Sequence, residues 1–293
     1  MHNPRLAQAR AALYPRVIQQ AINLVSEMIG LRITQDIISL TYQRTRPVVN
    51  AGRELARDLA YQDYLFVVDN DPVVEAMDLG RLTDDVWYRT IKRTFEDHEF
   101  FDDEVLEEIG MQVDHWTRDA EFGQKIAVAK ADRRLGRVAR VDPEPPSCPF
   151  CTLLNSRGPV YLNEETAAMT LHLGDECELV FVPAGTEDDY PGKDSVDQAK
   201  ELYKKAVEKA PTGSSKDILK ALGEMDPNRP EGRIKQITRA ATENAVSSQV
   251  RESRSRLETL ERLQPETESG KRFRDEQITR NRDILSVLET NSV

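Results

Sequence analysis

The sequence is short of cysteine, of aromatic residues and of long apolar runs, and these shortages exclude several classes of protein. Its three cysteines are an odd number, which argues against a disulfide framework and fits a chain made in a reducing cytoplasm. Its apolar stretches stay well below the roughly 18 residues that a membrane-spanning helix needs. The opening MHNPRLAQAR is polar and lacks the apolar core of a signal peptide. We therefore expect no membrane partner.

Positive charge is also in deficit. Lysine and arginine number 40 against 51 aspartates and glutamates, which leaves a formal net charge of -11. An acidic chain gains little from displacing counterions on a nucleic acid, so we expect no DNA binding beyond what a local basic patch would support. With 31% charged and 6% aromatic residues, the composition favours helices with wide solvated faces.

The local patterns of several enzyme classes are missing as well. The chain has no G-x-S-x-G, no H-E-x-x-H and no Walker loop, which mark serine hydrolases, zinc proteases and P-loop proteins. We interpret the acidic run DEVLEE, residues 103–108, as the start of a solvated helix, where negative charge suits the helix dipole. We interpret the basic run RRLGRVAR, residues 133–140, as a solvated helix end, with a phosphate or an acidic partner as the alternative.

Helical periodicity covers most of the sequence. Apolar residues recur at helical spacing from Arg16 to Ile29, from Ile33 to Tyr61 with a kink or break at Pro47, from Asp103 onward, and from Arg233 to Leu263. We therefore predict a mainly α fold. Helical N- and C-terminal arms would surround a small irregular α+β module that contains the cysteines.

The boundaries of that module follow from a change in composition. The stretch VDPEPPSCPF, which begins at Val141, has four prolines in ten residues and cannot be a helix interior. The segments GPVYL and CELVFVP carry the β-branched and aromatic residues of short strands. We therefore predict a helical bundle over residues 1–140, a cysteine module over 141–191, and a helical C-terminal region over 192–293. The last is expected to be extended, because its apolar stripe is thin.

All three cysteines lie inside the cysteine module. Together with one histidine, they form the pattern C-x2-C-x20-H-x4-C, made by Cys148, Cys151, His172 and Cys177. Zinc prefers four tetrahedral sulfur and imidazole ligands, and C-x2-C lets two thiolates reach one ion from a single turn. A structural Zn²⁺ on these four residues would hold together a segment too small to be stabilised by apolar burial alone.

Two other interpretations of the cysteines stay open. They could be small buried core residues beside a hydrogen-bonded histidine, or they could carry thiol chemistry, with a Cys/His pair as nucleophile and base. A redox role is less favoured, because no βαβ pattern surrounds the C-x2-C. If His172 points away, Asp175 is the replacement metal ligand.

The combination of motifs resembles the core of MuF-like phage head morphogenesis proteins, whose actinophage relatives are often called capsid maturation proteases. The resemblance covers RVARV, SCPFCTLLNSRGPVY and LHLGDECELVFVP, from about Arg137 to Pro183. The residues that match the motif are Arg140, Cys148, Cys151, Ser156, Arg157, Gly158, Val160, Tyr161, His172, Cys177 and Pro183. Many relatives have a further cysteine where this chain has Asp175, which leaves a Cys3His site or one with an aspartate ligand.

The resemblance implies a minor capsid protein that acts in head (procapsid) assembly and maturation near the portal. Its implied partners are the portal protein and the major capsid or scaffolding protein. Its implied locations are the host cytoplasm during assembly and then the interior of the prohead or virion. The alternative is a capsid maturation protease that uses a Cys/His pair, and the structural role is preferred because no nucleophile, base and oxyanion hole can be assembled from these residues.

Overall fold

The computed structural model describes residues 3–76, 82–142, 148–160, 177–225, 233–264 and 267–290, and the fold is mainly α, as predicted. The helices are α1 (Pro4–Val25), α2 (Gln35–Val67), α3 (Asp84–Thr94), α4 (Asp103–Ala131), α5 (Pro149–Asn155), α7 (Lys193–Lys209), α8 (Ser215–Met225), α9 (Arg233–Arg262) and α10 (Glu268–Thr290). The strands are β1 (Arg137–Val141) and β2 (Glu178–Val182). Within these ranges, no helix combines the length and the apolar character needed to cross a bilayer.

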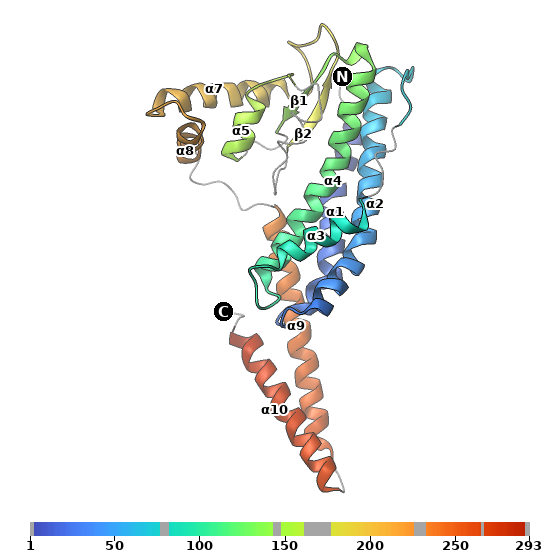
Figure 1. Ribbon diagram of the computed structural model, residues 1–293, viewed down its shortest axis with the longest axis vertical. Coiled ribbons are helices and arrows are strands. Elements are labelled where there is room, and N and C mark those ends of the chain that lie inside the picture. Colours follow the sequence, from blue (N-terminus) through green and yellow to red (C-terminus); the bar gives the residue numbers. More distant parts are fainter. Residues whose placement is uncertain are drawn as a thin grey trace.

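Helices α1, α2 and α4 run side by side and form the body of the molecule, with α3 packed across α2 and α4 (Figure 1). Their shared core is apolar and includes Val17, Ile22, Val49, Trp87 and Ile109. The first half of α9 completes this core, because its Ile234 and Ala241 are buried in the same cluster. The root of the C-terminal region therefore packs against the N-terminal bundle.

Side chains that cap the helix ends explain where several helices begin. The Asn3 side chain accepts a hydrogen bond from the Arg5 amide at 3.1 Å at the start of α1. Asp102 accepts one from the Val105 amide at 3.0 Å at the start of α4. Such caps satisfy amides that have no partner inside the helix. The helix predicted to begin near Asp103 is confirmed.

The predicted break at Pro47 is wrong, because α2 continues through the proline from Gln35 to Val67. Proline in a helix interior costs about 3 kcal/mol. Here Thr45 and Val49 on either side are both buried in the bundle. The packing of these residues in the bundle therefore outweighs the local cost of the proline, and the helix continues past it.

The two strands form an antiparallel pair whose register runs from Arg137 opposite Val182 to Val141 opposite Glu178. The predicted strand in CELVFVP is confirmed as β2. The interpretation of residues 133–140 as a solvated helix end is wrong from Arg137 onward, because residues 137–141 form β1, whereas Arg133 and Arg134 are exposed in the short helical turn after α4. Arg140 is fully buried there, with its guanidinium 5.6 Å from the centre of the Phe122 ring.

The remaining helices lie at two ends of the body. Helix α5 packs against α7, α8 and β1, and this group flanks the sheet (Figure 1). At the opposite end, the second half of α9 and all of α10 form a helical hairpin that projects beyond the bundle (Figure 1). We call the whole of α9 and α10 the C-terminal hairpin, of which the first half of α9 is the root.

A short polar turn links α4 to β1. The Tyr64 hydroxyl donates to Asp132 Oδ2 at 2.9 Å, and Arg134 Nη2 lies 2.7 Å from the same oxygen. The following Gly136 has a φ of 62°, and a Cβ there would meet the Val182 carbonyl oxygen at 3.2 Å. The turn thereby fixes where β1 begins and how closely it meets the end of β2.

The Asp132 turn makes a testable contribution to acid stability. Hydrogen bonds from Arg134 lower the pKa of Asp132 from 3.8 to about 2. The stabilisation is therefore complete above the unfolded pKa of 3.8 and is lost as the pH falls through about 2. We expect a contribution of about 1 to 2 kcal/mol at neutral pH, because Arg134 is 44% exposed and water screens the pair. Chemical unfolding at stepped pH would measure it: the free energy of unfolding should fall less between about pH 4 and 2 in Asp132→Asn than in the wild type.

Asp71→Asn is the control for that experiment. Asp71 is exposed and also contacts Arg134, but it does not take part in the Asp132–Tyr64 hydrogen bond. This variant should keep the acid dependence of the wild type. Identical slopes in the wild type and Asp132→Asn would contradict the assignment.

The close approach of α1 and α2 at Gly52 is also testable. A Cβ at Gly52 would lie 2.8 Å from Val17 Cγ1 and 3.2 Å from Thr117 Oγ1. Gly52→Leu should lower the free energy of unfolding by about 2 kcal/mol or more, because overpacking a filled core costs about 1–3 kcal/mol. The neighbouring Ala51 is exposed, so Ala51→Leu should leave stability within about 0.5 kcal/mol of the wild type. Urea unfolding followed by circular dichroism compares the two, and equal stabilities would show that the bundle does not close at this point.

Candidate functional site

The three cysteines occupy the connection between the two strands. Cys148 is the N-cap residue of α5, Cys151 lies in its first turn, and Cys177 immediately precedes β2. All three are free thiols, they are 9%, 3% and 1% exposed, and they form one buried cluster with Phe150 beside them. The three cysteines of the motif therefore lie in one buried cluster.

The geometry of Cys148 and Cys151 follows from the start of α5. The two Sγ atoms lie 3.1 Å apart, and Cys148 Sγ accepts a hydrogen bond from the Cys151 amide at 3.2 Å. An amide donor at a helix N-terminus favours a negatively charged sulfur. Two thiolates on one zinc ion, each at about 2.3 Å, would lie roughly 3.8 Å apart. The two sulfur atoms are therefore closer to each other than two ligands on a single ion would be.

Cys177 is held from two directions. Its Sγ lies 3.5 Å from Asn155 Oδ1 at the end of α5. Its carbonyl accepts from Arg118 Nη1 of α4 at 3.3 Å. Arg118 is itself buried, pairs with Asp114 at 2.9 Å and lies 4.0 Å from the centre of the Tyr14 ring. Helix α4 of the bundle therefore contacts the cysteine module directly.

The other residues of the motif fall into three groups. Arg140 is buried in β1, whereas Ser156 and Arg157 lie in the turn after α5. The Ser156 hydroxyl donates to the Leu153 carbonyl at 2.8 Å and so closes the end of α5. Gly158 is buried with a φ of 71°, which favours glycine, and faces the Lys200 side chain of α7. These residues shape the turn that follows the cysteines.

Three residues of the predicted site lie outside the described part of the chain. They are Tyr161, His172 and the alternative ligand Asp175. Among the residues that the structure does describe, no group of three or more His, Cys, Asp and Glu side chains is arranged to hold a metal ion. The four-ligand zinc set therefore stays a prediction.

A second polar centre, for which the sequence gives only a weak signal, lies where β2 meets the bundle. It contains Arg10 of α1, Asp63 of α2, Glu121 and Lys125 of α4, and Glu178 of β2. Arg10 Nε lies 2.7 Å from Glu121 Oε1, Arg10 Nη1 lies 3.3 Å from Glu178 Oε2, and Arg10 also pairs with Asp63. Lys125 Nζ lies 2.9 Å from Asp63 Oδ2 and 2.8 Å from Glu121 Oε1. We call these five residues the ionic cluster.

In the ionic cluster, burial and the attraction between opposite charges shift the pKa values in opposite directions. Burial would raise the pKa of Glu121, but Arg10 and Lys125 hold it below its ordinary value. Burial, with repulsion from Arg10, lowers the pKa of Lys125 to about 8. Lys125 Nζ also donates to the Leu179 carbonyl at 2.6 Å. The cluster therefore ties the backbone of β2 to α4 through a cation that depends on its carboxylate partners.

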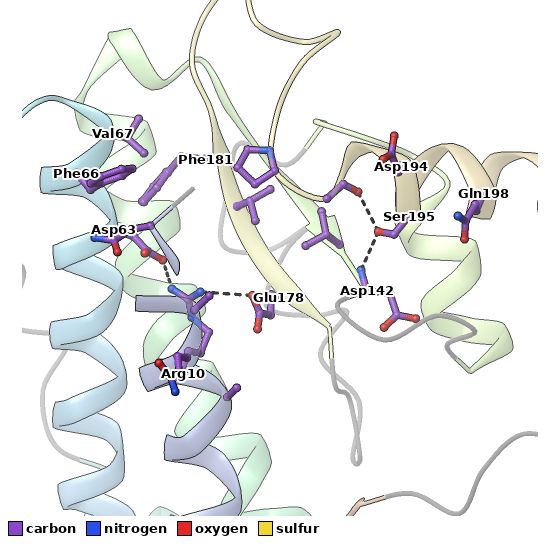
Figure 2. Close-up of a pocket in the computed structure, with 18 residues that line it drawn as sticks. Arg10, Asp63, Phe66, Val67, Asp142, Glu178, Phe181, Asp194, Ser195 and Gln198 are labelled. Atoms are coloured by element: carbon purple, nitrogen blue, oxygen red, sulfur yellow. Dashed lines mark hydrogen bonds and ion pairs between the residues drawn. The ribbon is translucent and has the colours of Figure 1, made fainter. Parts of the chain in front are cut away.

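The ionic cluster lies against a cavity of about 750 Å³ (Figure 2). Its walls come from α1, the end of α2, the strands and the start of α7, with Phe66, Val67 and Phe181 among the apolar lining residues. Figure 2 shows Arg10 held between Asp63 and Glu178 on one side of the cavity. On the other side, the Ser195 hydroxyl donates to the Gly192 carbonyl at 2.9 Å and accepts from the Asp142 amide at 3.3 Å.

The sequence carried only a weak signal for this second centre. Glu121 and Lys125 are four residues apart, which is the spacing of an ordinary surface ion pair on a helix. They lie within the apolar run AEFGQKIAVA, where charges are out of place on a buried face. Arg10 and Glu178 give no local signal, because their partners are distant in sequence.

Comparison with known proteins gives one match. A family model described as VG15 protein matches residues 7–206, which is well over half of the chain. The matched span contains α2 to α5 and both strands, and it ends before α8, α9 and α10. No curated protein and no solved structure matches the chain.

The ionic cluster predicts a large effect of a single substitution. Lys125→Met should lower the free energy of unfolding by about 3 kcal/mol or more, because it leaves buried carboxylates without their cation. Lys130→Met removes an exposed lysine of the same helix and should cost less than about 1 kcal/mol. Glu121→Gln combined with Lys125→Met should cost less than the sum of the single changes, since both members of one pair are removed. Urea unfolding measures Lys125→Met, Lys130→Met, Glu121→Gln and the double variant, and a Lys125→Met protein as stable as Lys130→Met would contradict the role of the cluster.

Proposed function

The chain belongs to the VG15 family and is a phage protein, and we propose that it is a minor capsid protein that acts in head assembly and maturation near the portal. The observation that carries the structural role is the burial of all three thiols in one cluster. A thiol that attacks a substrate must be reached by it, whereas a structural cysteine site is closed.

The cysteine module would serve as a rigid connection between the strands. In this proposal a structural Zn²⁺ is held by Cys148, Cys151 and Cys177, with His172 as fourth ligand and Asp175 as the alternative. The burial of the three cysteines in one cluster and the amide donor to Cys148 Sγ support it. The ion would supply binding energy that a connection of this size cannot obtain from apolar burial alone.

The C-terminal hairpin supports a role in assembly. It projects from the bundle (Figure 1), and Leu263 and Phe273 near its far turn are 50% and 62% exposed. Large exposed apolar side chains on a projecting element are suited to contact with another protein. We propose the portal protein and the major capsid or scaffolding protein as the partners, in the host cytoplasm during assembly and then inside the prohead or virion.

The alternative is a capsid maturation protease that uses a Cys/His pair. It would require one buried thiol to become accessible and to meet an imidazole. A specific test separates the two functions. In cells that produce phage heads, Cys151→Ser would stop cleavage of the major capsid protein if this thiol is the nucleophile. Under the structural proposal, heads are reduced in number, any cleavage of the capsid protein still occurs, and the chain is found in purified heads.

Metal removal tests the structural site directly. The purified wild type should contain about one zinc per chain, and a strong chelator should lower its melting temperature by about 10 °C or more. Cys151→Ser should melt at a similarly low temperature and should not respond to the chelator. If the cysteines are only core residues, the wild type contains no zinc, and the chelator has no effect on either protein.

A further inference from the structure

Asn155 is a buried polar residue beside the cysteines, and only half of its amide group is used. It is the last residue of α5, one helical turn after Cys151, and it is 1% exposed. Its Oδ1 atom accepts from the Cys177 thiol at 3.5 Å. Its Nδ2 atom is buried as well, and the described part of the chain offers it no hydrogen-bond partner. Both hydrogens of this amide are therefore left without an acceptor there.

A buried N–H group without an acceptor is unusual in a folded protein. Nearly all buried N–H groups are paired, and a carbonyl oxygen is left under-satisfied more readily than an N–H group. If Asn155 only filled space, leucine would serve better, because it has nearly the same shape and no polar atoms. The buried amide therefore indicates an acceptor for Nδ2 that exists in another state of the site.

The sulfur of Cys177 becomes that acceptor when it binds a metal ion. Coordination removes the thiol hydrogen, so a metal-bound sulfur can only accept. It would then face Asn155 Oδ1, another acceptor, with no hydrogen between them. Half a turn of the amide about its Cβ–Cγ bond exchanges Oδ1 and Nδ2, which have nearly the same size and shape. Nδ2 then donates to the sulfur, and one of the two N–H groups gains a partner.

We propose that Asn155 is a positioning residue of the zinc site and donates a hydrogen bond from Nδ2 to the metal-bound sulfur of Cys177. The inference rests on the proposed structural Zn²⁺ and extends it to a residue outside the ligand set. Cys148 Sγ already accepts from the Cys151 amide at 3.2 Å. A sulfur on each side of the site thus has an N–H donor. Such donors offset the negative charge that several thiolates bring to one ion, and they fix the orientation of the ligands.

Asn155→Leu tests the proposal on the purified full chain, because it affects the two states of the site differently. Without metal, the variant should unfold at the same urea concentration as the wild type or at a higher one, because the N–H groups without acceptors are gone. It should bind zinc about tenfold more weakly or worse, since residues that support metal ligands are typically worth about 10- to 100-fold in affinity. Urea unfolding and competition with a coloured chelator measure the two effects.

Asn50→Leu is the matched control. Asn50 lies in α2, and its Oδ1 atom is buried with no hydrogen-bond partner among the residues that the structure describes. It belongs to the bundle and not to the cysteine cluster. The same substitution at this position should change the unfolding midpoint equally with and without zinc, and the affinity for zinc should remain that of the wild type.

A measurement on the wild type covers the case in which Asn155→Leu does not fold. The chain carries isotope-labelled nitrogen in asparagine alone and is loaded with a magnetically active isotope of cadmium in place of zinc. A hydrogen bond to a metal-bound sulfur transmits spin coupling between the metal and the donated hydrogen. One asparagine side-chain amide should therefore show a coupling to cadmium in the NMR spectrum.

Three results would overturn the proposal. If the wild type binds zinc and Asn155→Leu binds it equally well, the zinc site stands and the role of Asn155 is wrong. If Asn155→Leu lowers stability to the same extent with and without metal, or if no asparagine side chain couples to cadmium, the residue only packs in the core. If the wild type binds no zinc, the structural metal site fails, and the inference about Asn155 fails with it.

Discussion

The ionic cluster is the interaction on which the placement of the sheet depends. A two-stranded sheet is marginal on its own in water and needs another surface to hold it. Here Glu178 is paired with Arg10, and Lys125 donates to the Leu179 carbonyl at 2.6 Å. Buried charges cost several kcal/mol each unless they are fully paired. If the sheet were shifted along the bundle, these charges would lose their partners. The cluster therefore selects one position for β2.

The position of the cysteine module follows from that of β2. Cys177 directly precedes the strand, and its carbonyl is held by Arg118 of α4. β1 is fixed against β2 by the strand register, and Arg140 on β1 is buried above Phe122. Cys148 and Cys151 then meet Cys177 across a connection whose two ends are both anchored to the bundle. The proposed metal site would therefore be built on a rigid base, which suits a closed structural site.

The sequence was sufficient for elements whose causes are local. Apolar spacing from Asp103 onward predicted α4, and β-branched and aromatic residues predicted β2. The motif placed the three cysteines in one module, and they are buried together in one cluster. The failures have causes that lie far away in sequence. Pro47 stays helical because the bundle holds its flanks, and Arg140 is buried in a strand because Phe122 of another element lies beneath it.

The ionic cluster could not be predicted for the same physical reason. Five residues between position 10 and position 178 meet there, and each of them alone resembles a solvated surface charge. Only the chain fold tells a buried Glu121–Lys125 pair from an exposed one, because the spacing of four residues is the same in both. The candidate ligands His172 and Asp175 lie outside the described residues, so the proposed zinc set rests on the sequence motif.

The C-terminal hairpin joins this rigid body through a close contact outside the matched family span. A Cβ at Gly110 of α4 would lie 3.0 Å from Ile234 Cγ2 of α9, so the two helices approach closely at that point. Ile234 and Ala241 complete the core of the bundle although the family match ends at residue 206. Further along, Gln249 donates to the Glu27 carbonyl at 3.1 Å. The root of the hairpin is thus held by the core, while its far end is exposed. A force on the far turn would therefore be transmitted to the bundle through α9, which is packed against it.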